Sequence, residues 1–140
     1  MFGMAAGLAH LGFVPFPSTF GAFAARKALD QIYMHICCQK LNVKIPGSYI
    51  GMTATECGPS QNVGEDIAVM RAMPYMRVIA PGDNLELRSA MHVMMEYDGP
   101  VYFRVPRSKL PYCLIPITGL NGEKVFCLEK VKIYHLSVRE

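Results

Sequence analysis

The chain has 140 residues and a formal net charge of +3, with 51% hydrophobic and 18% charged residues. This length is close to that of one domain and is sufficient to bury a core, and the composition excludes an intrinsically disordered chain. Basic residues are scattered, except in a locally basic end from Lys124 to Arg139, and this excludes a nucleic-acid-binding composition.

Strands and helices are predicted to alternate. Strands that lie between helices favour a mostly parallel sheet covered on both faces, which is a three-layer α/β/α fold. In chain order we expect a helix over 3–11 ending at Gly12, a strand over 13–18, a helix over 20–39, a strand over 42–49, a polar loop over 51–62, a helix over 63–73 stopped by Pro74, a strand over 76–80, a helix over 84–97 with Asp83 as N-cap, and a strand over 100–105.

The apolar start of the chain is not interpreted as a signal peptide, because it lacks a basic leading region and is interrupted by His10, Pro15 and Pro17. No uninterrupted apolar run is long enough to span a bilayer. The five cysteines include an adjacent pair but no Cys-x-x-Cys, and the four histidines share no ligand spacing. We therefore predict a reduced, cytoplasmic protein without a metal site of its own and without a membrane partner.

Two phenylalanines mark the point where a predicted strand passes into a helix. Phe20 and Phe23 are three positions apart, a spacing that places side chains on one helical face. Together they would form the wall of a flat pocket for a planar heteroaromatic ring. The spacing alone favours two ordinary core residues. However, the turn at Phe20, the loop from Gly51 and Arg107 all follow predicted strands, and ligands bind at the carboxyl ends of strands in such sheets.

A series of short motifs follows in a fixed order along the chain. Residues 18–32 run from Ser-Thr-Phe, through a second Phe and an Arg, to Asp-Gln-Ile. The small residues of 3–9 precede this segment, and Gly-Pro-Ser-Gln at 58–61, Glu-Asp-Ile-Ala at 65–68, Met-Arg-Ala-Met-Pro at 70–74, Asp-Gly-Pro-Val-Tyr at 98–102 and Arg104 follow it. In this order the motifs resemble the pyrimidine-binding domain of transketolase. The resemblance is weak after Pro111, so we expect that domain over 1–111 and a linker or the start of a C-terminal domain over 112–140.

The resemblance implies the thiamine-diphosphate-binding fold and a place in the pentose phosphate pathway. Transketolases move a two-carbon ketol unit between sugar phosphates, through a carbanion that the thiazolium ring of thiamine diphosphate stabilises. Their sites lie between subunits, and a sister domain grips the diphosphate and its Mg²⁺. We therefore expect a sister diphosphate-binding domain or subunit as partner, in a homodimer or hetero-oligomer, with a sugar phosphate as substrate.

The resemblance also assigns candidate site residues. Phe20 and Phe23 match the family's aromatic pyrimidine pocket, and Arg26 lies on the same helical face, where relatives have Tyr or Arg. Arg107 matches an arginine that binds the sugar phosphate, and the fork of guanidinium donors suits that anion. Without the resemblance, Arg107 is more simply a surface arginine after an edge strand.

Several positions depart from the family pattern. Tyr49 stands where a substrate-binding histidine is usual, and Cys57 replaces an aspartate that contacts a substrate hydroxyl. Gln61 occupies a position that is His in many members and Gln in others. The activating glutamate should lie just before Met1 and is absent from this chain. We therefore expect no catalytic residue within the chain and no activity from the chain alone, as for a fragment of a larger enzyme.

Three functional interpretations stay open. The first is the pyrimidine half-site of a transketolase-type enzyme. The second is a degenerate, non-catalytic paralogue that serves as an assembly or regulatory module, which the changes at Tyr49 and Cys57 favour. The third is a sister thiamine enzyme such as deoxyxylulose-phosphate synthase, whose pocket phrases differ from the one at residues 18–20.

Overall fold

A five-stranded sheet forms the centre of the structure. The computed structural model describes residues 1–51, 55–107 and 133–134. The strands lie in the order β1-β2-β4-β3-β5, with the first four parallel to their neighbours and β5 antiparallel to β3. Their bounds are Thr19–Phe20 for β1, Lys44–Ser48 for β2, Arg77–Ile79 for β3, Val101–Val105 for β4 and Ile133–Tyr134 for β5.

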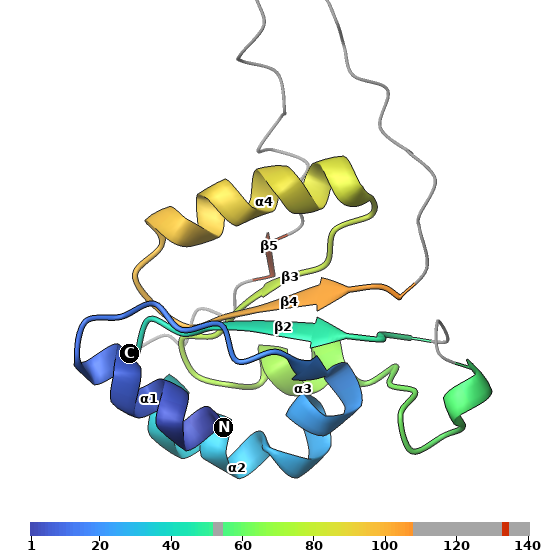
Figure 1. Cartoon of the computed structure of the whole chain (residues 1–140), viewed down its shortest axis with the longest axis horizontal. Coiled ribbons are helices and arrows are strands. Elements are labelled where there is room, and N and C mark those ends of the chain that lie inside the picture. Colours follow the sequence, from blue (N-terminus) through green and yellow to red (C-terminus); the bar gives the residue numbers. More distant parts are fainter. Residues whose placement is uncertain (52–54, 108–132, 135–140) are drawn as a thin grey trace, which may run out of the picture.

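Helices cover both faces of this sheet. Helix α4 (Asn84–Glu96) lies on one face, and α1 (Phe2–His10), α2 (Leu29–Ile32) and α3 (Asp66–Arg71) lie on the other (Figure 1). Among the described residues this arrangement has three layers, so the predicted α/β/α fold with a mostly parallel sheet is confirmed.

Each face of the sheet has its own apolar core, because side chains alternate along a strand. On β4, Val101 and Phe103 pack with Ala90 and Met94 under α4, whereas Tyr102 points to the other face. The larger core, on the side of α1, α2 and α3, contains the buried side chains of Phe2, Ala25, Ile32, Ile36, Ile45, Met70 and Val78.

Several predicted helix ends are confirmed. Asp83 caps α4, because its carboxylate accepts a 2.8 Å hydrogen bond from the backbone N–H of Glu86. The first helix ends two residues before Gly12, whose φ of +88° and 3.0 Å bond to the Ala9 carbonyl fit a helix stop. Helix α3 ends shortly before Pro74, as expected for a residue that cannot continue a helix.

The predicted strand over 13–18 is wrong. Pro15 and Pro17 lack the N–H that a ladder needs, and this segment is joined to β2 by the bond from Lys44 N–H to the Pro15 carbonyl at 3.0 Å without forming a strand. The first strand forms only after the prolines, at Thr19 and Phe20, where it pairs with Gly47 and Ser48 of β2. The strand therefore lies later than the sequence pattern indicated.

The predicted helix over 20–39 is also interrupted. Phe20 belongs to β1, and two five-residue π-helical turns, η1 (Phe23–Lys27) and η2 (Tyr33–Cys37), flank the short α2. Each wide turn is closed by a 2.9 Å bond across five residues, from Ala28 N–H to the Phe23 carbonyl and from Cys38 N–H to the Tyr33 carbonyl. Phe20 and Phe23 therefore face each other across a strand-to-helix junction rather than along one helical face.

The predicted linker over 112–140 lies outside the described residues, apart from the two residues of β5. Within the described ranges, no helix has the length and apolar character needed to cross a membrane. The same ranges contain no group of three His, Cys, Asp or Glu side chains placed to hold a metal ion.

Candidate functional site

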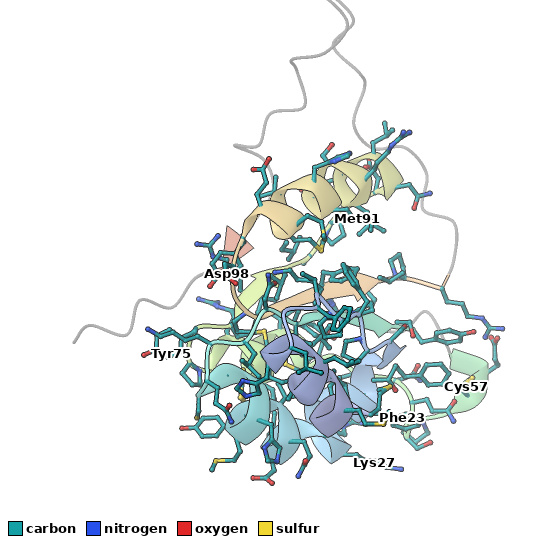
Figure 2. All side chains as sticks on the ribbon, turned by 60° about the vertical axis from the view of Figure 1, so that its left-hand side comes forward. Phe23, Lys27, Cys57, Tyr75, Met91 and Asp98 are labelled. Carbon is teal, nitrogen blue, oxygen red and sulfur yellow. The ribbon has the colours of Figure 1, made fainter. Side chains whose placement is uncertain are left out.

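The candidate residues gather at the carboxyl edge of the parallel strands. Phe20 ends β1, Tyr49 directly follows β2, and Arg107 lies two residues after β4. The register aligns these ends, since Phe20 pairs with Ser48 and Ser48 with Val105. Figure 2 shows Phe23 and Cys57 on this side of the molecule and Tyr75 and Asp98 on the opposite side. Chain segments that are distant in sequence therefore meet at one edge, as expected for this class of sheet.

Three aromatic rings stack at this edge. The ring centroids of Phe20 and Tyr49 are 4.3 Å apart with an interplanar angle of 28°, and those of Phe20 and Phe23 are 5.5 Å apart at 23°. Tyr49 reaches this position with a left-handed backbone, at φ +57°. Offset parallel rings at these distances gain packing and quadrupole energy. The stack therefore presents a flat apolar wall to a planar ligand.

A cation lies beside the stack. The Arg107 guanidinium is 5.1 Å from the centroid of the Tyr49 ring and forms an ion pair with Glu56. Both charged side chains are exposed, so the pair contributes little to stability and can open to an incoming anion. Glu56 lies in a 3₁₀ turn, η3 (Thr55–Cys57), that also carries Cys57. The arrangement combines an aromatic surface with a guanidinium that suits a phosphate.

Two cavities open next to the aromatic stack. One, of about 320 Å³, is lined by Phe20 and Phe23 together with the polar residues Ser18, Thr19 and Ser48. The Ser48 hydroxyl donates to the Thr19 carbonyl at 3.1 Å and so joins the two strands that form its floor. A cavity that combines aromatic rings with hydroxyl groups has the character of a small-molecule site.

The second cavity, of about 500 Å³, contains Arg26 on its wall. Arg26 donates to the Glu65 carboxylate at 2.6 Å and to the carbonyls of Pro59 and Asn62 at 3.4 and 3.1 Å. The hydrogen bond from Arg26 lowers the pKa of Glu65 to about 2. Arg26 therefore fixes the loop from Pro59 to Glu65, part of which lines this cavity. The full set of lining residues is Arg26, Gly51, Gly58, Pro59, Asn62, Val63 and Gly64.

The remaining predicted residues lie in the loop that closes this edge. Cys57 is partly buried at the end of η3. Gln61 is also partly buried and lies in a turn, where its backbone N–H donates to the Gly58 carbonyl at 3.3 Å. The structure thus brings Phe20, Phe23 and Tyr49 into contact and sets Arg107 beside them. The roles predicted for Cys57 and Gln61 stay predictions.

A buried polar network under the site was missed by the sequence reasoning. The Asp66 carboxylate accepts hydrogen bonds from the Tyr102 hydroxyl at 2.8 Å and from Arg104 Nε and Nη2 at 3.0 and 3.2 Å. Asp66 is completely buried. The pKa of Tyr102 is raised, mainly because its own hydroxyl is buried and secondly because the negative charge of Asp66 lies beside it. Alternation along β4, which sends Tyr102 and Arg104 to one face, was the available signal.

The fold and this edge define an α/β protein with an aromatic surface and a guanidinium at the carboxyl ends of its parallel strands. Residues 1–112 match the family described as the pyrimidine-binding domain of transketolase. The chain is 47% identical over 107 residues to a putative transketolase C-terminal section from Methanocaldococcus jannaschii, covering 76% of this chain and 34% of that protein. The chain therefore belongs to the transketolase pyrimidine-binding domain family, as the sequence motifs predicted.

Two further relatives extend this comparison. A 1-deoxy-D-xylulose-5-phosphate synthase from Nitratidesulfovibrio vulgaris is 37% identical over 103 residues, or 74% of this chain and 16% of that protein. A solved structure described as a split-gene transketolase, an inactive β4 tetramer, superposes with a TM-score of 0.72 at 41% identity, covering 82% of this chain and 36% of that one. The chain thus spans about a third or less of the length of these relatives.

Proposed function

We propose that the chain supplies the pyrimidine-binding half of a thiamine-diphosphate site, in an enzyme that transfers two-carbon ketol units between sugar phosphates. The observation that carries this proposal is the stack of Phe20, Phe23 and Tyr49 with Arg107 beside it, at the edge where this class of sheet binds ligands. The aromatic rings suit the pyrimidine, and the guanidinium suits the substrate's phosphate.

The residues present fit the cofactor's heterocycle. The 320 Å³ cavity offers Phe20 and Phe23 as an apolar wall. Asn62 Oδ1, on a residue that lines the neighbouring cavity, is a buried acceptor without a donor among the described residues. A ligand that extends into this second cavity with an amino group would satisfy such an atom. We assign the pyrimidine to Phe20 and Phe23, with Arg26 shaping the adjacent cavity. When bound, the cofactor supplies a thiazolium ring, an electron sink that no side chain offers.

Activity would require a partner that holds the diphosphate and Mg²⁺. The matched relatives are described as a C-terminal section and a split-gene transketolase, which supports a complementary domain or subunit. Apolar surface supports the same conclusion, because soluble monomers rarely expose large contiguous apolar patches. Around α1 and the segment after it, the exposed large hydrophobic residues are Met1, Met4, Leu8, Leu11, Phe13 and Phe16.

The test is ketol transfer from xylulose 5-phosphate, measured with the chain in its full-length context and its diphosphate-binding partner. Transfer by the assembled complex, and none by either component alone, supports the proposal. Cofactor binding by the complex without transfer would favour a degenerate, non-catalytic assembly module. A specific observation favours a second candidate, since the chain is 37% identical to a 1-deoxy-D-xylulose-5-phosphate synthase. Formation of 1-deoxy-D-xylulose 5-phosphate in place of ketol transfer would identify that reaction.

A further inference from the structure

The network of Asp66, Tyr102 and Arg104 contacts the backbone of the segments that carry the aromatic stack. A Cβ at Gly21, the residue after Phe20, would lie 3.0 Å from the Tyr102 hydroxyl. A Cβ at Gly47, two residues before Tyr49, would lie 2.6 Å from Cζ of the same ring. The Tyr102 side chain therefore packs directly against the β1 and β2 backbones, and glycine leaves it the space to do so.

The guanidinium of Arg104 lies near the turn that follows Tyr49 and contains Gly51. A Cβ at Gly51, two residues after Tyr49, would lie 3.9 Å from Arg104 Nη2. Gly51 itself donates a 2.8 Å backbone hydrogen bond to the Val63 carbonyl, which closes the turn against the loop before α3. Tyr49, with its left-handed backbone, thus lies between Gly47, packed on Tyr102, and Gly51, whose turn the Arg104 guanidinium approaches.

Asp66 sets the position of both side chains. Its carboxylate is fully buried and accepts two hydrogen bonds from Arg104, whose side chain is only 19% exposed, and one from Tyr102. A bidentate pair fixes the plane of a guanidinium as well as its place. Arg104 is also the second-last residue of β4 and lies three residues before Arg107. The pair therefore connects α3 to the two segments that present Tyr49 and Arg107.

We propose that Asp66, acting through Arg104, is a positioning residue that sets the geometry of Tyr49 and Arg107 for recognition of the substrate's phosphate group. This inference rests on the proposed function. Without the carboxylate, the Arg104 guanidinium is left buried without its counter-charge. We expect it to shift from this position, and the segments that it would then disturb are the Gly51 turn, which its Nη2 approaches, and the end of β4 that leads to Arg107. The binding of the phosphate group then loses its preorganised partners.

The first experiment uses Asp66→Asn in the assembled holoenzyme, since this variant keeps the shape of the side chain and removes its charge. The measured quantity is kcat/KM for a ketose phosphate divided by kcat/KM for the same ketose without phosphate. We expect this ratio to fall about tenfold to hundredfold, as for a misplaced binding group. Glu96→Gln is the control, because it removes an exposed carboxylate at the end of α4, and it should keep the ratio within about twofold of the wild type. Equal losses for both substrates in Asp66→Asn would overturn the inference.

The second experiment does not depend on turnover. Hydrogen exchange at the Gly51 amide reports the turn directly, because this N–H is bonded to the Val63 carbonyl. We expect Asp66→Asn to accelerate exchange at Gly51 about tenfold more than at Met94, a buried residue of α4 that reports global opening. Equal acceleration at both positions would reduce Asp66 to a purely structural role.

The two measurements separate the inference from the proposed function. A wild-type enzyme without any preference for the phosphorylated substrate would contradict phosphate binding at Arg107. Exchange at Gly51 would still decide whether Asp66 controls the Tyr49 turn. If Asp66→Asn does not fold, Arg104→Lys provides the same test, because it retains the buried charge and loses the two-pronged hydrogen bond.

Discussion

Phe20 and Tyr49 stack with ring centroids 4.3 Å apart, although Phe20 ends β1 and Tyr49 follows β2. The parallel pairing of β1 with β2 aligns Phe20 with Ser48 and so brings the next residue, Tyr49, to the same edge. Phe23, at the start of η1, also stacks on Phe20, with ring centroids 5.5 Å apart. The proposed ligand wall is therefore a product of strand register, and any change that shifts β1 against β2 should open it.

Replacement of Phe23 by Ala tests that wall. Loss of the ring should weaken binding of thiamine diphosphate by about 1–3 kcal/mol, on the scale of lost aromatic packing, with little change in subunit assembly. The dissociation constant of the cofactor, measured by titration calorimetry on the assembled complex, gives the result. Tyr75→Ala is the control, because Tyr75 is 44% exposed, lines neither cavity at the stack and lies on the opposite side of the molecule (Figure 2). Unchanged cofactor affinity in Phe23→Ala would contradict the assignment.

Gly47→Ala tests the packing of Tyr102 beneath the site. The added Cβ would lie 2.6 Å from Tyr102 Cζ, closer than side-chain atoms can approach, so the strand or the ring must move. Forcing extra volume into a packed core costs typically about 1–3 kcal/mol, and we expect that loss in the free energy of unfolding by urea. Gly7→Ala is the control, because Gly7 lies in helix α1 and a Cβ at this position would meet no atom within 4 Å. This helical exchange should be neutral or stabilise by up to about 1 kcal/mol.

Part of the site followed from local sequence. The motif around Phe20 and Phe23 and the position of Arg107 after a strand were enough to place a candidate site at the carboxyl edge, and the structure brings these residues together there. The edge itself could be predicted because strands alternated with helices and each was followed by a turn signal. These features depend on residues that are close in sequence.

The rest depends on long-range geometry that a periodic pattern does not encode. Tyr49 joins the stack only because its backbone adopts φ +57° at the end of β2. Asp66 meets Tyr102 and Arg104 because α3 packs against the strand on which both lie. The false strand over 13–18 arose because its apolar residues outweighed the two prolines in the pattern, although each proline removes a ladder donor.

Glu56→Gln tests the ion pair at Arg107. Removal of the carboxylate should free the guanidinium for an external anion, because the pair is exposed and Glu56 competes with that anion for the same donors. An exposed pair is typically worth about 0.2–1 kcal/mol, so we expect inorganic phosphate to bind about 1.4- to 5-fold more tightly. Competition of phosphate with the sugar phosphate substrate, measured on the assembled enzyme, gives this affinity. Glu96→Gln should leave it unchanged, and a weaker affinity in Glu56→Gln would mean that Glu56 itself contributes to the anion site.

Lys44 provides a pH-dependent test of the fold at the opposite end of β2. Its side chain is fully buried, and Nζ donates to the carbonyls of Tyr97 and Gly99 at 2.7 and 2.8 Å. Burial, assisted by the charge of Arg77 and opposed by that of Asp98, lowers the pKa of Lys44 from 10.5 to about 8. A neutral amine still has two N–H groups, so deprotonation need not break either hydrogen bond.

The sign of the effect follows from proton binding. Between about pH 8 and pH 10.5 the unfolded chain binds the proton at Lys44 and the folded chain does not, so this residue makes the fold more stable as the pH rises through that window. At 1.36 kcal/mol per pKa unit, the gain is at most about 3 kcal/mol. Burial raises the pKa of Cys37 from 9.0 to about 12, and this has the opposite effect as the pH rises above 9. The unfolding free energies of the wild type and of Lys44→Met are measured with urea at pH 7, 9 and 10.5. The contribution of Cys37 cancels when the two proteins are compared, because both contain it. The difference in unfolding free energy, wild type minus variant, should grow with pH, and a constant difference would show that Lys44 has an ordinary pKa in the fold.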